Sequence, residues 1–216
     1  MSAHYSNPKV SYFSVPKCAC TSLKAFFFRL ENDRNFRKCR VNGRLFTVQD
    51  VYPTRPFAEV AADTAEGAWK FAVVRDPVAR VLSFYRTNIV HRGLLNRPQL
   101  ARKLTANGLS TSPNASEFVQ HLERYQEVSV PVQWHTQPLS FFLGNDAAWF
   151  DLLVSPSELG TLHSELSSRF ENVPEIPHRN SKGPKISRED LGAAEIAKLE
   201  TMYSQDFEIF GDYIGR

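Results

Sequence analysis

Residues 9–24 read KVSYFSVPKCACTSLK, and this stretch decides the fold. Its first part, Lys9 to Val15, reads as a short strand. From Ser22 onward, apolar residues recur at i, i+3, i+4 and i+7, the spacing of one helical face: Leu23, Phe26, Phe27 and Leu30. The stretch therefore predicts a strand, a loop and a helix in that order.

A second strand-to-helix junction follows further along the chain. Trp69 to Val74 (WKFAVV) is a near-continuous apolar run, as expected of a strand that helices bury on both faces. Asp76 is placed to cap a helix whose first position is Pro77. The buried stripe of that helix is predicted to consist of Val78, Val81, Leu82, Tyr85 and Ile89.

The remaining elements complete an α/β pattern. Leu45 to Val48 and Asp151 to Ser155 read as strands, and residues 116–125 and 156–170 as helices. The last helix is predicted over residues 188–204, with Ala193, Ile196, Leu199, Met202 and Tyr203 facing inward. We interpret residues 31–44 as polar surface, and residues 92–114 and 171–187 as the longest loops. Alternating strands and helices predict a three-layer α/β domain with a mainly parallel sheet, whose ligands lie beyond the carboxyl ends of the strands.

Composition sets the broad class of the protein. A chain of 216 residues with 42% hydrophobic residues suffices for one compact domain, so residues 1–216 are expected to form a single domain. The net charge of +3 suits an anionic ligand but is too small for a nucleic-acid groove. The sequence has no 18-residue apolar run and no signal peptide pattern, and its three cysteines cannot build a disulfide framework. We therefore expect a cytoplasmic protein with free thiols.

The loop after the first strand has the chemistry of an anion site. The N–H groups of residues 18–22 (Cys18, Ala19, Cys20, Thr21 and Ser22) are expected to point out of a helix N-terminus. Lys17 adds a positive charge, and the hydroxyls of Thr21 and Ser22 add hydrogen-bond donors. A phosphate or sulfate group is the ligand that this combination favours.

Other interpretations of the same loop fit less well. A nucleotide-kinase loop requires glycines, and residues 15–24 contain none. A cysteine phosphatase loop requires an arginine after its cysteine with five residues between them, and at these positions the chain has Lys24 after Cys18 and Phe26 after Cys20. Zinc is disfavoured because Cys18 and Cys20 are too close together for a usual zinc knuckle. When this loop is considered alone, a purely structural interpretation remains an alternative: a capped helix with buried thiols and no ligand.

The second junction supplies a second anion site. Arg75 ends the strand, and Ser83 lies on the following helix, so the two side chains are predicted to hold another anionic group. Both junctions fall on the same edge of a parallel sheet. Two anion sites on one edge indicate a ligand with two separated phosphates.

With these residues in place, the chain resembles the sulfotransferases that use 3′-phosphoadenosine 5′-phosphosulfate (PAPS). PKCACTSL resembles their 5′-phosphosulfate loop, and VVRDPVARVLSFYR their 3′-phosphate motif. The match is closest to the carbohydrate, Golgi-type branch, and LETMYSQDFEIFGDY resembles the closing helix and strand of that branch. The resemblance spans residues 10–213 and implies a three-layer domain of the P-loop NTPase type with a central sheet flanked by helices.

The resemblance also implies roles for individual residues. Lys17, Thr21 and Ser22, with the N–H groups of residues 18–22, would bind the 5′-phosphosulfate, and Arg75 and Ser83 the 3′-phosphate. The later loop NSKGPK resembles the segment that closes over the nucleotide, which implies contacts from Asn180, Ser181, Lys182, Gly183 and Lys185; a solvated basic turn is the alternative. Cys18 and Cys20 are then packing residues.

The chemistry of sulfuryl transfer fits this set of residues. Charge builds on the departing 5′-phosphate during in-line attack by an acceptor hydroxyl, and Lys17 is placed where that charge develops. The sequence offers no carboxylate cluster of the kind that holds magnesium, so we expect transfer without a metal.

The general base is ambiguous in this sequence. Many carbohydrate members show H-W-x-P-Q, whereas this chain reads Gln133-Trp134-His135-Thr136-Gln137, so the histidine is shifted by two positions. In an extended segment, positions 133 and 135 point to the same side, which keeps His135 as a candidate base; a structural histidine is the alternative. His91 is the reserve candidate.

The sequence thus predicts a PAPS-dependent sulfotransferase that acts on a hydroxyl of a carbohydrate or glycolipid. A glycolipid acceptor would bring peripheral contact with a membrane. The alternative is a catalytically silent module that binds a nucleotide or bisphosphate through the same loops. Because the chain is short for the branch and shows no membrane anchor, a bacterial cytoplasmic member is expected. The basic stretch from Arg34 to Arg44 could face an acidic sugar, although a solvated surface is the simpler interpretation.

Overall fold

The structure is a computed structural model that describes residues 10–61, 64, 67–177 and 186–214. The chain divides into two compact units, one formed by residues 1–75, 139–179 and 209–216 and the other by residues 76–138 and 180–208. That the whole chain is a single domain stays a prediction.

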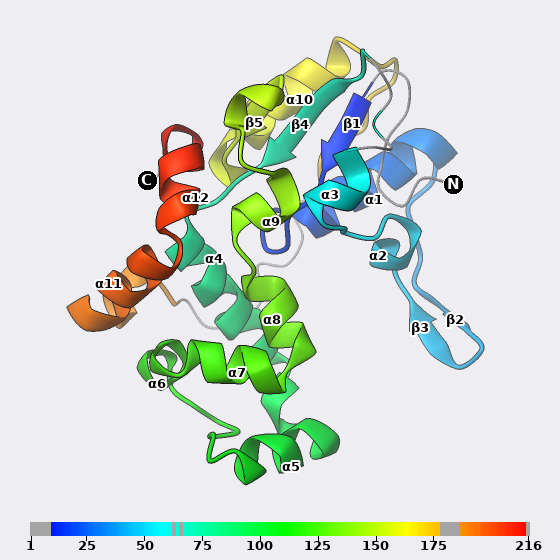
Figure 1. Cartoon of the computed structure of the whole chain (residues 1–216). Coiled ribbons are helices and arrows are strands. Elements are labelled where there is room, and N and C mark those ends of the chain that lie inside the picture. Colours follow the sequence, from blue (N-terminus) through cyan, green and yellow to red (C-terminus); the bar gives the residue numbers. More distant parts are fainter. Residues whose placement is uncertain (1–9, 62–63, 65–66, 178–185, 215–216) are drawn as a thin grey trace. The chain divides into compact units, whose positions relative to one another are not determined.

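A parallel three-stranded sheet organises the first unit (Figure 1). Its strands are β1 (Val10–Phe13), β4 (Trp69–Val73) and β5 (Leu152–Val154), with β4 in the centre. The register pairs Phe13 with Ala72 and Phe71 with Leu152. Because all three strands run in one direction, their carboxyl ends meet at one edge of the sheet. The predicted strands at residues 9–15, 69–74 and 151–155 are confirmed with slightly shorter bounds.

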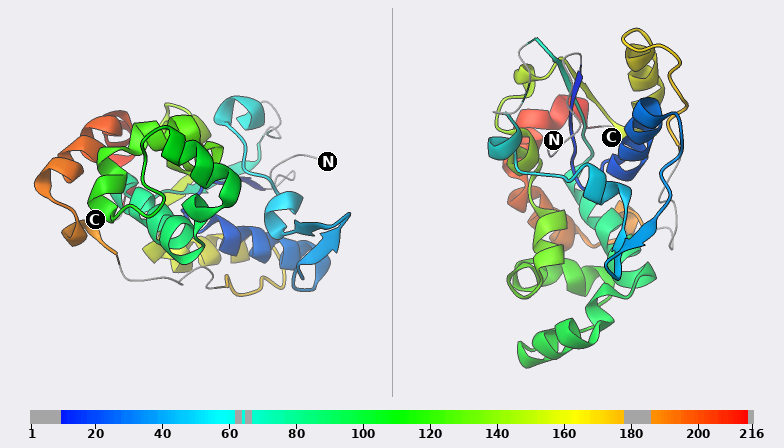
Figure 2. Two further views of the ribbon diagram at one scale, coloured as in Figure 1. Left: turned by 90° about the horizontal axis from the view of Figure 1, so that it is seen from below. Right: turned by 90° about the vertical axis from the view of Figure 1, so that its right-hand side faces the viewer.

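Helices cover both faces of this sheet, as the right-hand view of Figure 2 shows. One face carries α1 (Cys20–Asn32) and α10 (Leu159–Ser167), and the other carries α3 (Phe57–Val60) and α9 (Leu139–Leu143). The alternation of side chains along β1 explains this arrangement: Tyr12 packs against Phe27 of α1, while Phe13 packs against Phe57 of α3. The predicted mixed α/β fold with a parallel sheet flanked by helices is confirmed.

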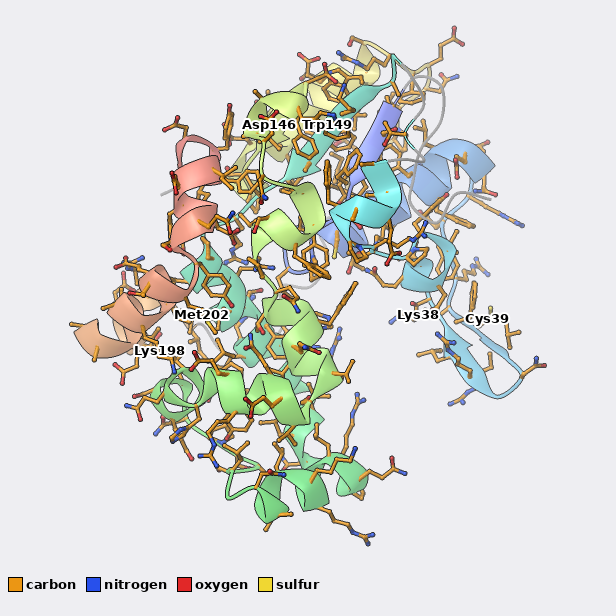
Figure 3. The ribbon with its side chains drawn as sticks, viewed as in Figure 1. Lys38, Cys39, Asp146, Trp149, Lys198 and Met202 are labelled. Atoms are coloured by element: carbon orange, nitrogen blue, oxygen red, sulfur yellow. The ribbon has the colours of Figure 1, made fainter. Side chains whose placement is uncertain are left out.

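The segment between α1 and β4 holds more elements than the single strand that the sequence predicted there. A two-stranded antiparallel hairpin, β2 (Cys39–Val41) and β3 (Arg44–Phe46), is followed by α2 (Val48–Val51). The strand predicted from Leu45 to Val48 therefore lies slightly earlier, because the Thr47 hydroxyl and the Asp50 carboxylate form a capping box that starts α2. Lys38 and Cys39 mark the start of this exposed hairpin in Figure 3, which agrees with the predicted surface location.

The second unit is helical. Its elements are α4 (Pro77–Phe84), the π-helix η2 (Tyr85–His91), η3 (Leu94–Asn96), α5 (Pro98–Ala106), α6 (Ala115–Gln120), α7 (Leu122–Val128), α8 (Val130–Thr136), η6 (Arg188–Asp190) and α11 (Ala193–Met202). The predicted stripe of the 77–89 helix is buried in the core of this unit, where Phe118, Tyr125, Leu199 and Tyr203 also lie.

Several predictions for this unit are corrected. Residues 92–114 are not one long loop, since η3 and α5 lie within them. The predicted helix 116–125 is interrupted at His121. The predicted last helix is divided into η6, α11 and the beginning of α12 (Ser204–Phe210), and Ala193 is exposed rather than buried.

Short 3-10 helices also belong to the first unit. They are η4 (Ala147–Trp149), η5 (Pro156–Glu158) and η7 (Gly211–Tyr213). The helix predicted over residues 156–170 is therefore a short 3-10 turn followed by α10. The closing strand implied by the resemblance is not found among the described residues, because α12 continues directly into η7.

Candidate functional site

The predicted first loop connects β1 to α1 through residues 14–19. Lys17 and Ala19 both adopt the left-handed backbone conformation, with φ values of 69° and 54°. This conformation costs a residue with a Cβ atom roughly 1 kcal/mol, and glycine adopts it without that cost. The chain thus places two strained residues in this loop, and such strain concentrates at functional sites.

The N-terminus of α1 has no cap from a side chain. Ala19 occupies the capping position and cannot accept a hydrogen bond through its methyl group, and the first turn contains no acidic residue. By contrast, Asp76, Asn114 and Ser129 cap α4, α6 and α8 with a side-chain oxygen. The first amides of a helix have no acceptor within the helix, and they carry its positive dipole end. The start of α1 therefore suits an anionic ligand.

The other residues of this loop divide into packing and polar positions. Cys18 is fully buried and Ser22 is buried, whereas Cys20 and Thr21 are half-buried. Cys18, Cys20 and Cys39 are all free cysteines. The burial of Cys18 agrees with the interpretation of this cysteine as a packing residue.

Arg75 lies at the same edge of the sheet as this loop. Val74 extends the pairing of β4, since its N–H donates to the carbonyl of Val154 at 2.9 Å, and half-buried Arg75 follows directly. The parallel register of β1 and β4 therefore brings Lys17 and Arg75 to one edge. Ser83 is a half-buried residue of α4 and belongs to the helical unit.

The junction at Asp76 forms as predicted. Its carboxylate accepts a hydrogen bond from the Ala79 N–H at 2.7 Å, and Pro77 occupies the first turn of α4. Arg80 of the same helix is fully buried, and its guanidinium lies 5.9 Å from the centre of the Tyr203 ring. It also donates to the carbonyl of Gln137.

The structure corrects the reasoning that supported His135. Residues 130–136 form helix α8 rather than an extended segment, so positions 133 and 135 point about 200° apart and not to the same side. Nδ1 of His135 lies 2.8 Å from the carbonyl of Pro131, and the ring stacks on Phe84 with 5.1 Å between centroids. The reserve candidate His91 is an exposed residue at the end of η2.

Five predicted nucleotide contacts lie outside the described residues: Asn180, Ser181, Lys182, Gly183 and Lys185. Two further observations bear on the class of ligand. The described residues contain no group of three or more histidine, cysteine or acidic side chains that could hold a metal ion. None of the helices in the described part of the chain is long and apolar enough to cross a membrane.

Sequence reasoning missed a polar network beneath the loop. Lys24 of α1 is 1% exposed, and its Nζ donates to Gln49 Oε1 at 2.6 Å and to Thr54 Oγ1 at 2.7 Å. Burial lowers the pKa of Lys24 from 10.5 to about 8, while the neighbouring Cys20 thiol opposes this shift. The signal in the sequence was a single lysine inside the apolar run LKAFFF.

Comparison with known proteins identifies the family. The model of the sulfotransferase family matches residues 5–213, almost the entire chain. A search of curated proteins finds no match. The chain belongs to the sulfotransferase family, whose reaction transfers a sulfuryl group to an acceptor.

Proposed function

We propose that this sulfotransferase uses PAPS as its donor and a carbohydrate or glycolipid hydroxyl as its acceptor. The observation that carries the proposal is the uncapped N-terminus of α1, which lies beside Lys17 at the sheet edge that also bears Arg75. Two cationic side chains at one edge suit a nucleotide with two separated anionic groups. The chemistry of the residues present therefore fits the donor.

Each residue has a role in this proposal. Lys17, Thr21, Ser22 and the amides of residues 18–22 bind the 5′-phosphosulfate and stabilise charge on the departing 5′-phosphate. Arg75 and Ser83 bind the 3′-phosphate, and residues 180–183 and 185 contact the nucleotide.

His135 removes the proton of the acceptor hydroxyl as its oxygen attacks sulfur. The new bond joins the acceptor oxygen to sulfur, and the bond from sulfur to the bridging oxygen breaks in line with it. The electron pair of that bond leaves with the 5′-phosphate, which departs as adenosine 3′,5′-bisphosphate. A hydrogen bond from Nδ1 to the Pro131 carbonyl would leave Nε2 as the basic nitrogen of the ring.

A thermal-shift comparison tests the donor. Adenosine 3′,5′-bisphosphate at 100 times its Kd is expected to stabilise the wild-type protein by about 2.7 kcal/mol, and AMP at equal concentration by less. Arg75→Ala is expected to remove the difference between the two nucleotides, and Arg102→Ala, on the exposed face of α5, serves as the matched control. Equal shifts with both nucleotides in the wild-type protein would show that the 3′-phosphate assignment is wrong.

Turnover separates the enzyme from a silent binding module. Labelled PAPS is incubated with a panel of glycans and lipid extracts, with and without EDTA. We expect transfer in both conditions and loss of transfer in Lys17→Ala. Tight binding of adenosine 3′,5′-bisphosphate without transfer to any acceptor, and without slow PAPS hydrolysis, would favour the silent module.

A further inference from the structure

Lys24 is a buried cation whose hydrogen-bond partners among the described residues are all neutral. Its ammonium group contacts the amide oxygen of Gln49 and the hydroxyl of Thr54, and no carboxylate among the described residues forms an ion pair with it. A buried charge is costly unless a group of opposite charge compensates it. The fold therefore keeps a positive charge beneath the anion loop at a cost in stability.

The contact with Gln49 fixes the direction of the next hydrogen bond. An ammonium group only donates, so the amide oxygen of Gln49 faces Lys24 and its NH₂ group faces away. Gln49 Nε2 then lies 3.0 Å from Thr21 Oγ1, which must accept because the amide nitrogen has no lone pair to offer. The hydroxyl proton of Thr21 is thus left for another acceptor, and none is found among the described residues.

The contact with Thr54 leads to a second hydroxyl, that of Ser14. Thr54 Oγ1 accepts from Lys24, and it lies 2.8 Å from Ser14 Oγ. Either hydroxyl could donate in this second contact, because Thr54 Oγ1 keeps another lone pair. An acceptor beside Ser14, such as a bound anion, selects the arrangement in which Thr54 donates to Ser14 and Ser14 donates to the anion. Ser14 follows the last residue of β1, and Thr21 is the second residue of α1, so both hydroxyls border the loop of residues 14–19.

We propose that Lys24 is a positioning residue that acts through Gln49 and Thr54 to turn the hydroxyl protons of Thr21 and Ser14 toward the anionic 5′ end of the donor. This inference rests on the proposed function and deepens it, because it adds Ser14 to the binding groups and gives the buried lysine a role. The charge of Lys24 polarises both chains of hydrogen bonds, and the bound anion supplies an opposite charge that the described residues do not provide.

A double-mutant cycle on nucleotide binding tests this role. Calorimetry gives the Kd of adenosine 3′,5′-bisphosphate for the wild-type protein, Lys24→Met, Thr21→Val and the double variant. Each single variant is expected to bind about tenfold more weakly, the loss of one hydrogen bond to a charged group. Because Lys24 acts partly through Thr21, the affinity of the double variant is expected to fall by clearly less than the product of the two single losses in affinity. The proposal is overturned if the factors by which the two single substitutions raise the Kd multiply fully in the double variant. It is also overturned if Lys24→Met binds the nucleotide as tightly as the wild-type protein does.

A second variant covers the case in which Lys24→Met does not fold. Gln49→Glu has nearly the same shape and gains an ion pair with Lys24, but its carboxylate can only accept, so it captures the Thr21 proton. For Gln49→Glu we expect an unchanged or higher Tm and at least tenfold weaker binding of the nucleotide. The loss of affinity is expected to be smaller when the same substitution is made in Thr21→Val. Equal losses in both backgrounds would show that added charge alone is responsible. Gln126→Glu is the matched control, because Gln126 also donates to a threonine, Thr136.

The same cycle measured with AMP separates the two proposals. AMP carries a 5′-phosphate but no 3′-phosphate, so it reports on the loop even if the PAPS assignment fails. One result would support the network and reject PAPS as the donor. In that result, Lys24→Met and Thr21→Val are coupled in AMP binding, and the wild-type protein binds AMP and adenosine 3′,5′-bisphosphate with equal affinity. Binding of neither nucleotide by the wild-type protein overturns both.

Discussion

Nδ1 of His135 lies 2.8 Å from the carbonyl oxygen of Pro131, one turn earlier in α8. A carbonyl only accepts, so this contact places the proton of the neutral ring on Nδ1 and makes Nε2 the basic nitrogen. The histidine is thus held in one tautomer by its own helix. The contact gives the general-base assignment a support that does not depend on the spacing of the sequence motif.

His135→Asn tests this assignment, because the asparagine amide can keep a donor near the Pro131 carbonyl but has no basic nitrogen. We expect kcat to fall by about 10²- to 10⁴-fold, the usual contribution of a general base, with the Kd of the nucleotide unchanged. His121→Asn, at the junction of α6 and α7, is the control. An unchanged kcat in His135→Asn would remove this histidine from the mechanism and direct the same experiment to His91.

Local signals in the sequence predicted the parts of the fold that depend on neighbouring residues. The junction at Asp76 and Pro77 is one case, because a cap and the first turn of a helix lie within a few residues of each other. Helix α8 had a similar signal that was missed: Ser129 caps it, and Pro131 lies in its first turn. Interpreting that stretch through its resemblance to a motif led to the wrong, extended conformation.

Residues of the candidate site could be predicted from the sequence only where its chemistry is local. Lys17 and the loop up to Ser22 are contiguous, so residue types alone indicated an anion site. The network of Lys24 is different, because its partners Gln49 and Thr54 come 25 and 30 residues later and are placed by the packing of α2 and the segment after it. No pattern along the chain reports such contacts.

Lys17 combines a strained backbone with a charge that we propose to act in catalysis, and two substitutions separate these properties. Lys17→Ala and Lys17→Gly are both expected to lose at least a hundredfold in kcat, because each removes the cation that the proposed function places at the departing group. Lys17→Gly is expected to be about 1 kcal/mol more stable than Lys17→Ala, since glycine adopts a φ of 69° without strain. Urea denaturation and turnover measure the two effects.

Lys103→Ala, on the exposed surface of α5, controls for the loss of a lysine. Two results would contradict this prediction. Equal stability of the glycine and alanine variants would show that the left-handed conformation is not costly here, and retained turnover would show that Lys17 is not the group that stabilises the departing phosphate.

The cap of α4 is a separate stability prediction. Asp76 accepts from the Ala79 N–H at 2.7 Å, so Asp76→Ala is expected to lower the free energy of unfolding by about 1 kcal/mol and the Tm by roughly 2–4 °C. Asp76→Asn keeps the accepting oxygen and should lose less. Asn114 caps α6 in the same way, since its Oδ1 accepts from the Glu117 N–H at 2.8 Å. Asn114→Ala should therefore lower the free energy of unfolding by a similar amount. A loss above 3 kcal/mol in Asp76→Ala alone would indicate that this aspartate does more than cap the helix.

Buried Lys24 makes the stability of the protein rise with pH between about 8 and 10.5. Burial lowers its pKa from 10.5 to about 8 in the folded protein, so between these values the unfolded chain binds more protons than the folded one. Stability rises with pH wherever the unfolded state binds more protons. The contribution of Lys24 is therefore least favourable below pH 8 and improves as the pH rises toward 10.5.

Comparison with Lys24→Met isolates this effect, because the buried tyrosines, whose pKa values burial raises, are common to both proteins. From pH 7 to pH 9.5, the wild-type protein is expected to gain on the order of 2 kcal/mol in free energy of unfolding relative to the variant. Urea denaturation at the two pH values measures the difference, and Lys198→Met should follow the wild-type protein because Lys198 lies at the surface, where it donates to Glu123. Parallel pH profiles for the wild-type protein and Lys24→Met would show that Lys24 titrates at its ordinary pKa and that its positive charge is not held in a buried, uncompensated state.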